Sequence, residues 1–98
     1  MLKSDFDKGN PIMVKYEITL AGSAEKEYNL LPKNIQVRIT KEIDSLQENP
    51  RPYGIVKLKG KEDIFRIRVG DYRIIYCIND KKHLIDVIYI RHRREVYR

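Results

Sequence analysis

The sequence predicts an α+β fold, with a two-helix hairpin packed on one face of a small twisted antiparallel β-sheet. Apolar residues recur at helical spacing between residues 24 and 46 and alternate with polar residues from residue 64 to about 90. Proline-rich and glycine-containing stretches separate these regions and divide the second into short runs. One block of helices and one of strands indicate the α+β class.

The domain is expected to span residues 13–98, after a flexible lead-in at residues 1–12. The lead-in is polar, ends near a Gly-Asn-Pro breaker, and has no apolar segment of the kind a signal peptide needs. Met13 is a second candidate for the first residue of translation. Residues 16–20 alternate between apolar and polar and predict the first strand.

Two helices with a short connection follow this strand. Ser23 is the expected N-cap of the first, which runs to about Leu31. The second runs from about Lys33 to Gln47, since a proline is tolerated just before it and two more stop it. Its apolar residues have helical spacing: Ile35, Ile39, Ile43 and Leu46.

Short strands are expected after the helices, at residues 55–57, 65–69, 72–78 and 83 to about 90. The Gly-Asp pair at residues 70–71 predicts a tight hairpin. In that register the helix-facing side is apolar, and a slip of one residue would bury arginines instead. The pairs expected on this side are Val69 with Tyr72 next to the turn, then Ile67 with Ile74 and Phe65 with Tyr76.

The opposite face of the same hairpin carries neighbouring arginines. Arg68 opposes Arg73, and Arg66 lies two residues along. Like charges opposed across strands are destabilising by up to ~1 kcal/mol, so the cluster indicates a bound anion. The alternative is structural ion pairing with Glu62 or Glu95, brought in by the tertiary fold.

Charge is also uneven along the chain. The net charge is +6, from 20 Lys and Arg against 14 Asp and Glu. Residues 1–56 hold eight of each sign, so the twelve basic and six acidic residues of 57–98 carry the whole excess. Such a basic surface is typical of a phosphate binder, RNA above all, or of a module that docks an acidic protein. No apolar run could span a membrane, and the lone Cys77 excludes an internal disulfide, which fits the cytoplasm.

The basic tail at residues 91–98 is expected to emerge beside the sheet. Its His92 and Tyr97 are suited to proton transfer, and its arginines to phosphate contacts. RNA carries its own nucleophile, the 2′-hydroxyl, so no metal or other cofactor is expected. The sequence also has no clustered metal ligands and no glycine-rich phosphate loop.

Three motifs, taken in order, resemble the RelE/ParE superfamily of bacterial toxin–antitoxin toxins: KLKG, RIRVGDYRIIY and HRREVY. The similarity covers about residues 14–98. It implies a microbial RNase-like fold, an antitoxin partner, and one of two activities. RelE-like members cut mRNA in the ribosomal A site, whereas ParE-like members act on DNA gyrase.

The resemblance also implies catalytic positions, which favour the RelE-like branch: Arg66, Arg68, Arg73, Arg91, His92, Arg93 and Tyr97. Arg66 and Arg68 replace lysines of the best-studied RelE pattern, and arginine effectively cannot lose its proton to act as a base. Proton transfer would then fall to His92 or Tyr97. The arginine after the last strand is either Arg91 or Arg93. RNA-binding candidates outside this set are Lys57, Lys59, Lys61 and Arg94.

Overall fold

The computed structural model describes residues 15–58, 60 and 63–96, with residues 95 and 96 as backbone only. The expected lead-in at residues 1–12 lies outside this part. The described helices and strands are, in order, β1 (Glu17–Leu20), α1 (Gly22–Asn29), α2 (Lys33–Ser45), β2 (Val56–Lys57), β3 (Ile64–Val69), β4 (Tyr72–Asn79), β5 (Leu84–His92) and α3 (Arg93–Val96).

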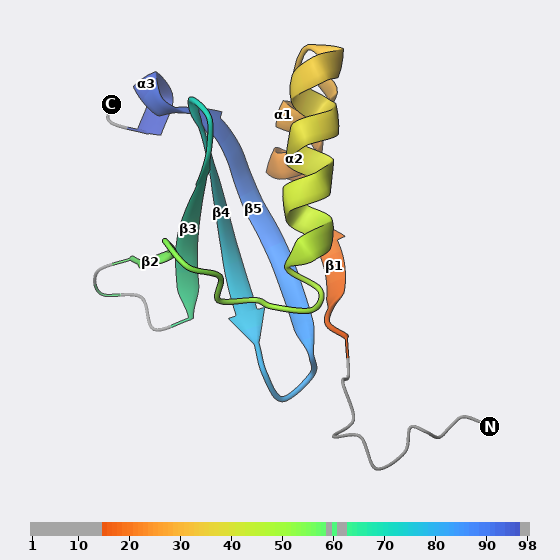
Figure 1. Cartoon of the computed structure of the whole chain (residues 1–98), viewed down its shortest axis with the longest axis vertical. Coiled ribbons are helices and arrows are strands. Elements are labelled where there is room, and N and C mark those ends of the chain that lie inside the picture. The colour runs from red at the N-terminus through yellow and green to blue at the C-terminus, as the bar shows by residue number, and fades with distance from the viewer. Residues whose placement is uncertain (1–14, 59, 61–62, 97–98) are drawn as a thin grey trace, which may run out of the picture.

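The strands form one sheet in the order β1-β5-β4-β3-β2, and α1 and α2 stand together on one side of it (Figure 1). This arrangement confirms the α+β class. The expectation of an antiparallel sheet is wrong at one pair, because β1 runs parallel to β5 with Ile18 beside Ile85. The chain between these two strands passes through both helices and three other strands. The alternation at residues 16–20 predicts a strand but does not show which strand it pairs with or in which direction.

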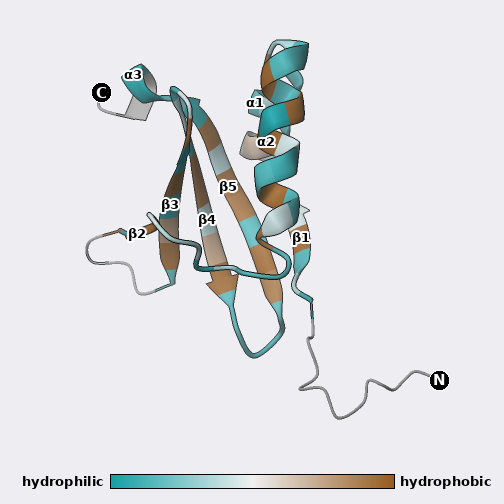
Figure 2. Cartoon of the chain, viewed as in Figure 1, coloured by the Kyte–Doolittle hydropathy of each residue, from teal (hydrophilic) through white to brown (hydrophobic). Residues whose placement is uncertain are grey.

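The predicted register of the β3–β4 hairpin is confirmed. Val69 pairs with Tyr72, and Arg68 pairs with Arg73. Gly70 has a φ of 60°, the positive value that a two-residue type II′ turn requires at its first central position. The apolar pairs then fall on the helix side, and Figure 2 shows hydrophobic residues along much of β3 and β4.

The core lies between the helices and the inner side of β3, β4 and β5. Apolar side chains at the predicted helical spacing in α2 meet alternate residues of the strands, as period-two and period-3.6 patterns require. The buried apolar residues are Ala24, Ile39, Ile43, Leu46, Phe65, Ile67, Ile74, Tyr76, Ile78, Ile85, Val87 and Ile90. No helix in the described part of the chain is long and apolar enough to cross a membrane.

Most element boundaries fall within two residues of the sequence-based expectation, and two of the differences affect the site. The N-cap of α1 is Ala21, so Ser23 lies inside the helix, and its hydroxyl donates to the carbonyl oxygen of Ile88 at 2.7 Å. The last strand continues past Ile90 to His92, and a short helix, α3, follows it directly. The expected tail therefore begins as part of the sheet.

A polar cluster joins the start of β1, the loop after α2 and the β4–β5 turn. The Asp80 carboxylate accepts hydrogen bonds from the Tyr16 hydroxyl at 2.6 Å and from both terminal nitrogens of Arg51, at 3.2 and 2.9 Å. The bonds from Arg51, and then from Tyr16, lower the pKa of Asp80. The cluster lies at the opposite end of the sheet from the turn at residues 70–71.

We expect Asp80→Asn to lower the free energy of unfolding at pH 7 by less than about 1 kcal/mol, because the Arg51 and Asp80 side chains are 45% and 56% exposed. A lowered folded-state pKa stabilises the fold fully above the unfolded value of ~3.9, and this stability is lost as the pH falls through the folded value. Urea unfolding should therefore show a gap between wild type and variant at pH 7 that narrows as the pH falls below ~3.9.

The matched control for this prediction is Glu48→Gln. Glu48 pairs with Lys15 at 3.7 Å, and both side chains are about two-thirds exposed, at 66% and 65%. We expect no measurable change there. A gap between wild type and Asp80→Asn that does not narrow at acid pH would show that the Asp80 charge is not its source.

Candidate active site

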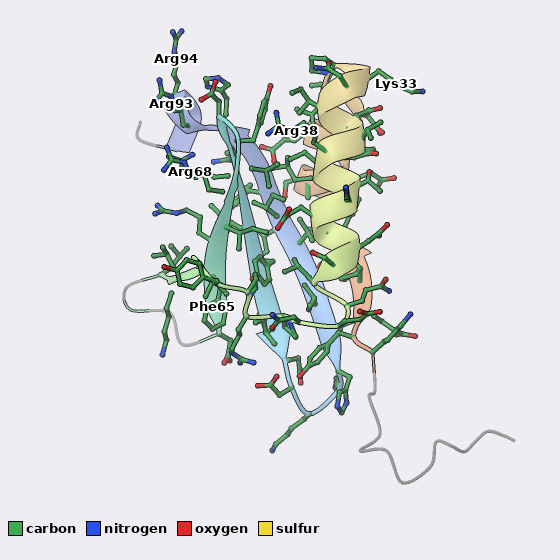
Figure 3. The ribbon with its side chains drawn as sticks, in the orientation of Figure 1. Lys33, Arg38, Phe65, Arg68, Arg93 and Arg94 are labelled. Atoms are coloured by element: carbon green, nitrogen blue, oxygen red, sulfur yellow. The ribbon has the colours of Figure 1, made fainter. Side chains whose placement is uncertain are left out.

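Three arginines lie directly opposite one another across the central strands. Arg68 of β3 pairs with Arg73 of β4, and Arg73 pairs in turn with Arg91 of β5. We call these three residues the arginine row, and the sheet face that carries them, away from α1 and α2, the outer face. Figure 3 shows Arg68 pointing away from the helices.

Exposure varies along the arginine row. Arg68 is exposed and Arg91 is half-buried, whereas Arg73 is 4% exposed. Arg73 is covered because β4 lies between β3 and β5, and because α3 packs against β4 and β5 at this end of the sheet. The middle of the row is therefore a cation held in place by its surroundings, with a more accessible arginine on each side.

Arg91 reaches the outer face because of a β-bulge in β5 whose extra residue is Ile88. Val87, just before the bulge, and Ile90, two residues after it, are both buried on the helix side, so Arg91 faces the outer side. Strict alternation from Val87 would instead have turned Arg91 toward the helices, and bulges commonly re-aim a side chain in this way. The register on the two sides of the bulge is Ile75 with Tyr89 and Tyr76 with Val87.

Glu27 and Tyr89 both contact the Arg91 side chain. Its Nε donates to Glu27 of α1 at 2.8 Å, and its guanidinium carbon lies 3.7 Å from the centre of the Tyr89 ring. For the hairpin arginines Arg66, Arg68 and Arg73, Glu62 or Glu95 is the structural ion-pair alternative that the sequence offers. Glu62 and the Glu95 side chain lie outside the described part of the structure, and the described carboxylate partner is Glu27.

Sequence reasoning missed Glu27, although a signal was present. Ser23 and Glu27 are four residues apart in α1 and so share one helix face. Both bond to the same stretch of β5, since Ser23 donates to the Ile88 carbonyl and the other Glu27 oxygen accepts from the Ile90 amide at 2.7 Å. Two polar residues at helical spacing, next to the buried Ala24, indicate that this edge of the helix contacts polar groups of another element.

His92 does not join the arginine row. Alternation along β5 puts it on the helix side, opposite Tyr72, and the two rings meet edge to face with centroids 5.3 Å apart. The Nδ1 of His92 accepts a hydrogen bond from the Arg94 amide at 3.3 Å, which makes His92 the cap of α3. The sequence-based expectation groups His92 with the arginines at the catalytic positions, and it depends on a last strand that ends at about Ile90.

Arg93 and Arg94 extend the basic surface from α3. The Arg93 amide donates to the Asp71 carbonyl at 2.7 Å, and its side chain lies 3.8 Å from the Asp71 carboxylate. Figure 3 shows both arginines on the same side of the sheet as Arg68. Of the two candidates for the post-strand position, Arg91 is in the arginine row and Arg93 is bound to the β3–β4 turn.

The other predicted site residues divide into placed and undescribed ones. Arg66 lies on the outer face, half-buried, between Val56 and Ile75. Lys57 is exposed but opposes Phe65, so its strand position belongs to the helix side. The remaining predicted residues lie outside the described part of the chain: Lys59, Lys61 and Tyr97.

One further cation approaches this end of the sheet from α2. A Cβ placed on Gly70 would lie 3.0 Å from a terminal nitrogen of Arg38, so this guanidinium rests against the β3–β4 turn. Figure 3 shows Arg38 on the helix side, away from Arg68. No local pattern reveals this contact, because it depends on how α2 packs over the hairpin.

The arginine row can hold an anion but cannot transfer protons. Arginine stays charged, and its planar fork matches the oxygens of a phosphate. Fixed cations also stabilise negative charge that develops during a reaction. Among the described residues, no group of three or more His, Cys, Asp or Glu is placed to hold a metal ion.

Comparison with known proteins identifies the class. Residues 18–97 match the family model described as the ParE toxin of a type II toxin–antitoxin system, parDE. The toxin RelE of Mycobacterium tuberculosis is 29% identical, over 85% of this chain and 87% of its own. The mRNA interferase toxin RelE of Escherichia coli K12 is 32% identical, over 76% and 81%.

Solved structures of RelE toxins superimpose on this chain. RelE in the archaeal RelE–RelB complex from Pyrococcus horikoshii superimposes with a TM-score of 0.72 at 31% identity, over 81% of this chain and 96% of that one. The isolated RelE toxin of Escherichia coli gives a TM-score of 0.71 at 29% identity, over 84% and 90%. The chain belongs to the RelE/ParE superfamily of type II toxin–antitoxin toxins, as its motifs predict.

Proposed function

We propose that the protein is the toxin of a type II toxin–antitoxin pair and inhibits translation by cutting mRNA in the ribosomal A site. The observation that carries this proposal is the arginine row, in which Arg73 is held between Arg68 and Arg91 on a sheet face with net positive charge. Relatives named mRNA interferase support the same activity.

The reaction needs no group beyond the RNA and the protein. The 2′-hydroxyl oxygen attacks the adjacent phosphorus and loses its proton to a base, while the bond from phosphorus to the 5′-oxygen breaks. An acid protonates that oxygen, leaving a 2′,3′-cyclic phosphate and a 5′-hydroxyl end. Arg68 and Arg73 clamp the scissile phosphate, and Arg66 and Arg91 stabilise the charge that develops on its oxygens. Neither metal nor cofactor has a role in this scheme.

Proton transfer belongs to the C-terminal segment, where Tyr97 and His92 are the titratable candidates. The position of His92 on the helix side, as the cap of α3, favours Tyr97 for contact with the RNA. Arg93 and Arg94, with Lys59 and Lys61, supply phosphate contacts that steer the RNA or the ribosome without reading its sequence.

A cognate antitoxin is the expected partner. The neighbours in solved structures include RelE bound to RelB from Pyrococcus horikoshii and from Escherichia coli. A segment that covers the outer face of this protein must neutralise the arginine row and shield the exposed edge of the sheet. We therefore expect it to carry acidic residues interspersed with apolar ones.

A ParE-like poison of DNA gyrase is the second candidate, and the name of the matching family model favours it. In that case the arginines would serve a protein interface and would cut nothing. Both candidates share the fold and the antitoxin, so only the target distinguishes them.

Primer extension on cellular mRNA after induction of the toxin distinguishes the two candidates. We expect new 5′ ends inside reading frames within minutes, with plasmid supercoiling unchanged. A reporter mRNA whose start codon has been removed is the control, and it should stay intact because ribosomes do not enter it. A supercoiling defect without new mRNA ends would replace the proposal by gyrase poisoning. Normal growth would indicate an inert relative.

A further inference from the structure

We infer that Glu27 is a positioning residue for mRNA cleavage, which fixes Arg91 in the arginine row and lowers the charge of the row. This inference rests on the proposed function. It starts from the two oxygens of one carboxylate. One accepts the Ile90 backbone amide at 2.7 Å, and the other accepts Arg91 Nε at 2.8 Å.

The hydrogen bond from the Ile90 amide fixes the position of the Glu27 carboxylate in this ion pair. A carboxylate that bonds only to an arginine can move with it, but the bond to Ile90 fixes Glu27 relative to β5 itself. The Glu27 side chain is 26% exposed, so water competes little with these bonds. The Tyr89 ring carries the guanidinium from the other side, with the carbon 3.7 Å from the ring centre. Arg91 is thus held at a defined point of the row.

The fold explains why α1 supplies this carboxylate. Strand β1 ends at Leu20, and the amide of Ala21 makes the last main-chain bond to β5, at Val87. Beyond that point α1 takes over the edge of β5. The Ser23 hydroxyl donates to the carbonyl of the bulge residue Ile88. The Glu27 carboxylate accepts from the amide of Ile90, which points toward α1 at the same edge of β5. The same residues therefore hold the bulge that turns Arg91 outward.

Glu27 also offsets the repulsion within the row. Arg73 has an arginine directly opposite it on both neighbouring strands, an arrangement that like charges make unfavourable. One carboxylate at the Arg91 end lowers the local positive charge. Removing it should therefore strengthen the attraction of the row for RNA, while it releases Arg91 from its position.

These two effects have opposite consequences in kinetics, which a purely structural role would not produce. For Glu27→Gln, single-turnover cleavage of mRNA on programmed ribosomes should show a rate constant about 10-fold lower, because Arg91 is less well placed. The toxin concentration for half-maximal rate should fall about 2-fold or more, because one negative charge beside the phosphate site is gone. Gln keeps an oxygen for the Ile90 amide, so the variant should fold.

Two further variants separate charge from reach. Glu27→Asp keeps the charge but is one methylene too short, so the rate constant should fall with the half-maximal concentration unchanged. Glu25→Gln makes the same charge change on the exposed part of α1 and should leave both values near wild type.

A double-mutant cycle with Arg91 completes the test. In the Arg91→Ala background, Glu27→Gln should lower the rate constant no further, because the two residues act as one unit. An equal loss in both backgrounds, or a Glu27→Gln protein indistinguishable from Glu25→Gln, would overturn the role of Glu27 alone. If wild type itself leaves mRNA on ribosomes intact, the proposed function fails, and this role fails with it.

Discussion

Arg73→Ala is expected to abolish growth arrest and to lower mRNA cleavage at least about 100-fold. The removal of one charge-stabilising donor from a preorganised site typically costs ~10²–10³ in rate. Arg73 is the middle member of the arginine row and is 4% exposed, so its surroundings hold it in place. The measurement is primer extension after induction, together with the rate of cleavage on programmed ribosomes.

The loss must be separated from misfolding, because alanine also removes a buried side chain. Taking one of three opposed arginines away relieves like-charge repulsion, so we expect the variant to fold and to bind its antitoxin. Arg73→Lys keeps the charge without the planar fork and should recover only part of the activity. Lys33→Ala, an equal charge change on α2, should cut as wild type does. Full toxicity of a well-folded Arg73→Ala protein would refute the assignment.

The core of the site could be predicted from the sequence because it depends on local patterns. Gly70 and the alternation on either side of it define the β3–β4 register, and that register places Arg68 against Arg73. A one-residue slip would move arginines into the core, so the hydrophobic pattern admits one solution. The two-thirds of the row that lie in this hairpin follow from a window of about a dozen residues.

The last third of the row could not be predicted in the same way. Arg91 faces outward because Ile88 is a bulge, and the bulge is supported by Ser23, more than sixty residues earlier in the chain. The sequence shows only a broken alternation, with apolar residues at both 87 and 88. The same bulge turns His92 toward the helices. The expectation that His92 lies among the arginines is wrong, because the length of the strand and the position of the bulge depend on the tertiary fold.

The partner of Arg91 illustrates the same limit. The sequence suggests Glu62 or Glu95 as partners for the hairpin arginines and none for Arg91. The described partner is Glu27 of α1, which the parallel pairing of β1 and β5 brings to the edge of β5. A parallel pair joins segments far apart in the chain, and no spacing rule within either segment reveals it.

The largest effect on stability is expected at Tyr76, which lies on the same strand as Arg73 but on the opposite face. Tyr76 is fully buried, with its ring 6.2 Å from that of Phe65, and its hydroxyl donates to the Pro50 carbonyl at 2.7 Å. Burial raises the pKa of Tyr76 far above its usual range, so the hydroxyl remains a donor. The side chain therefore ties the loop after α2 to the centre of the sheet.

Two substitutions at Tyr76 separate the ring from the hydroxyl. Tyr76→Ala should lower the free energy of unfolding by about 3–5 kcal/mol, as the loss of a buried aromatic ring does. Tyr76→Phe should cost about 1–2 kcal/mol, for the lost hydrogen bond and the carbonyl left behind. Urea unfolding measures both, and Tyr53→Ala, at a fully exposed tyrosine, should change little. Equal losses for the two variants would show that the hydroxyl, not the ring, stabilises this part of the fold.

Stability and activity should separate at these two positions of β4. A domain of this size has ~5–15 kcal/mol of stability, so Tyr76→Ala loses much of it and should lose toxicity through unfolding. Its remaining folded fraction should still cut mRNA at the wild-type rate per folded molecule. Arg73→Ala should instead leave a folded population that does not cut. If Tyr76→Ala lost activity beyond its unfolded fraction, the core beneath the row would also determine the geometry of the arginines above it.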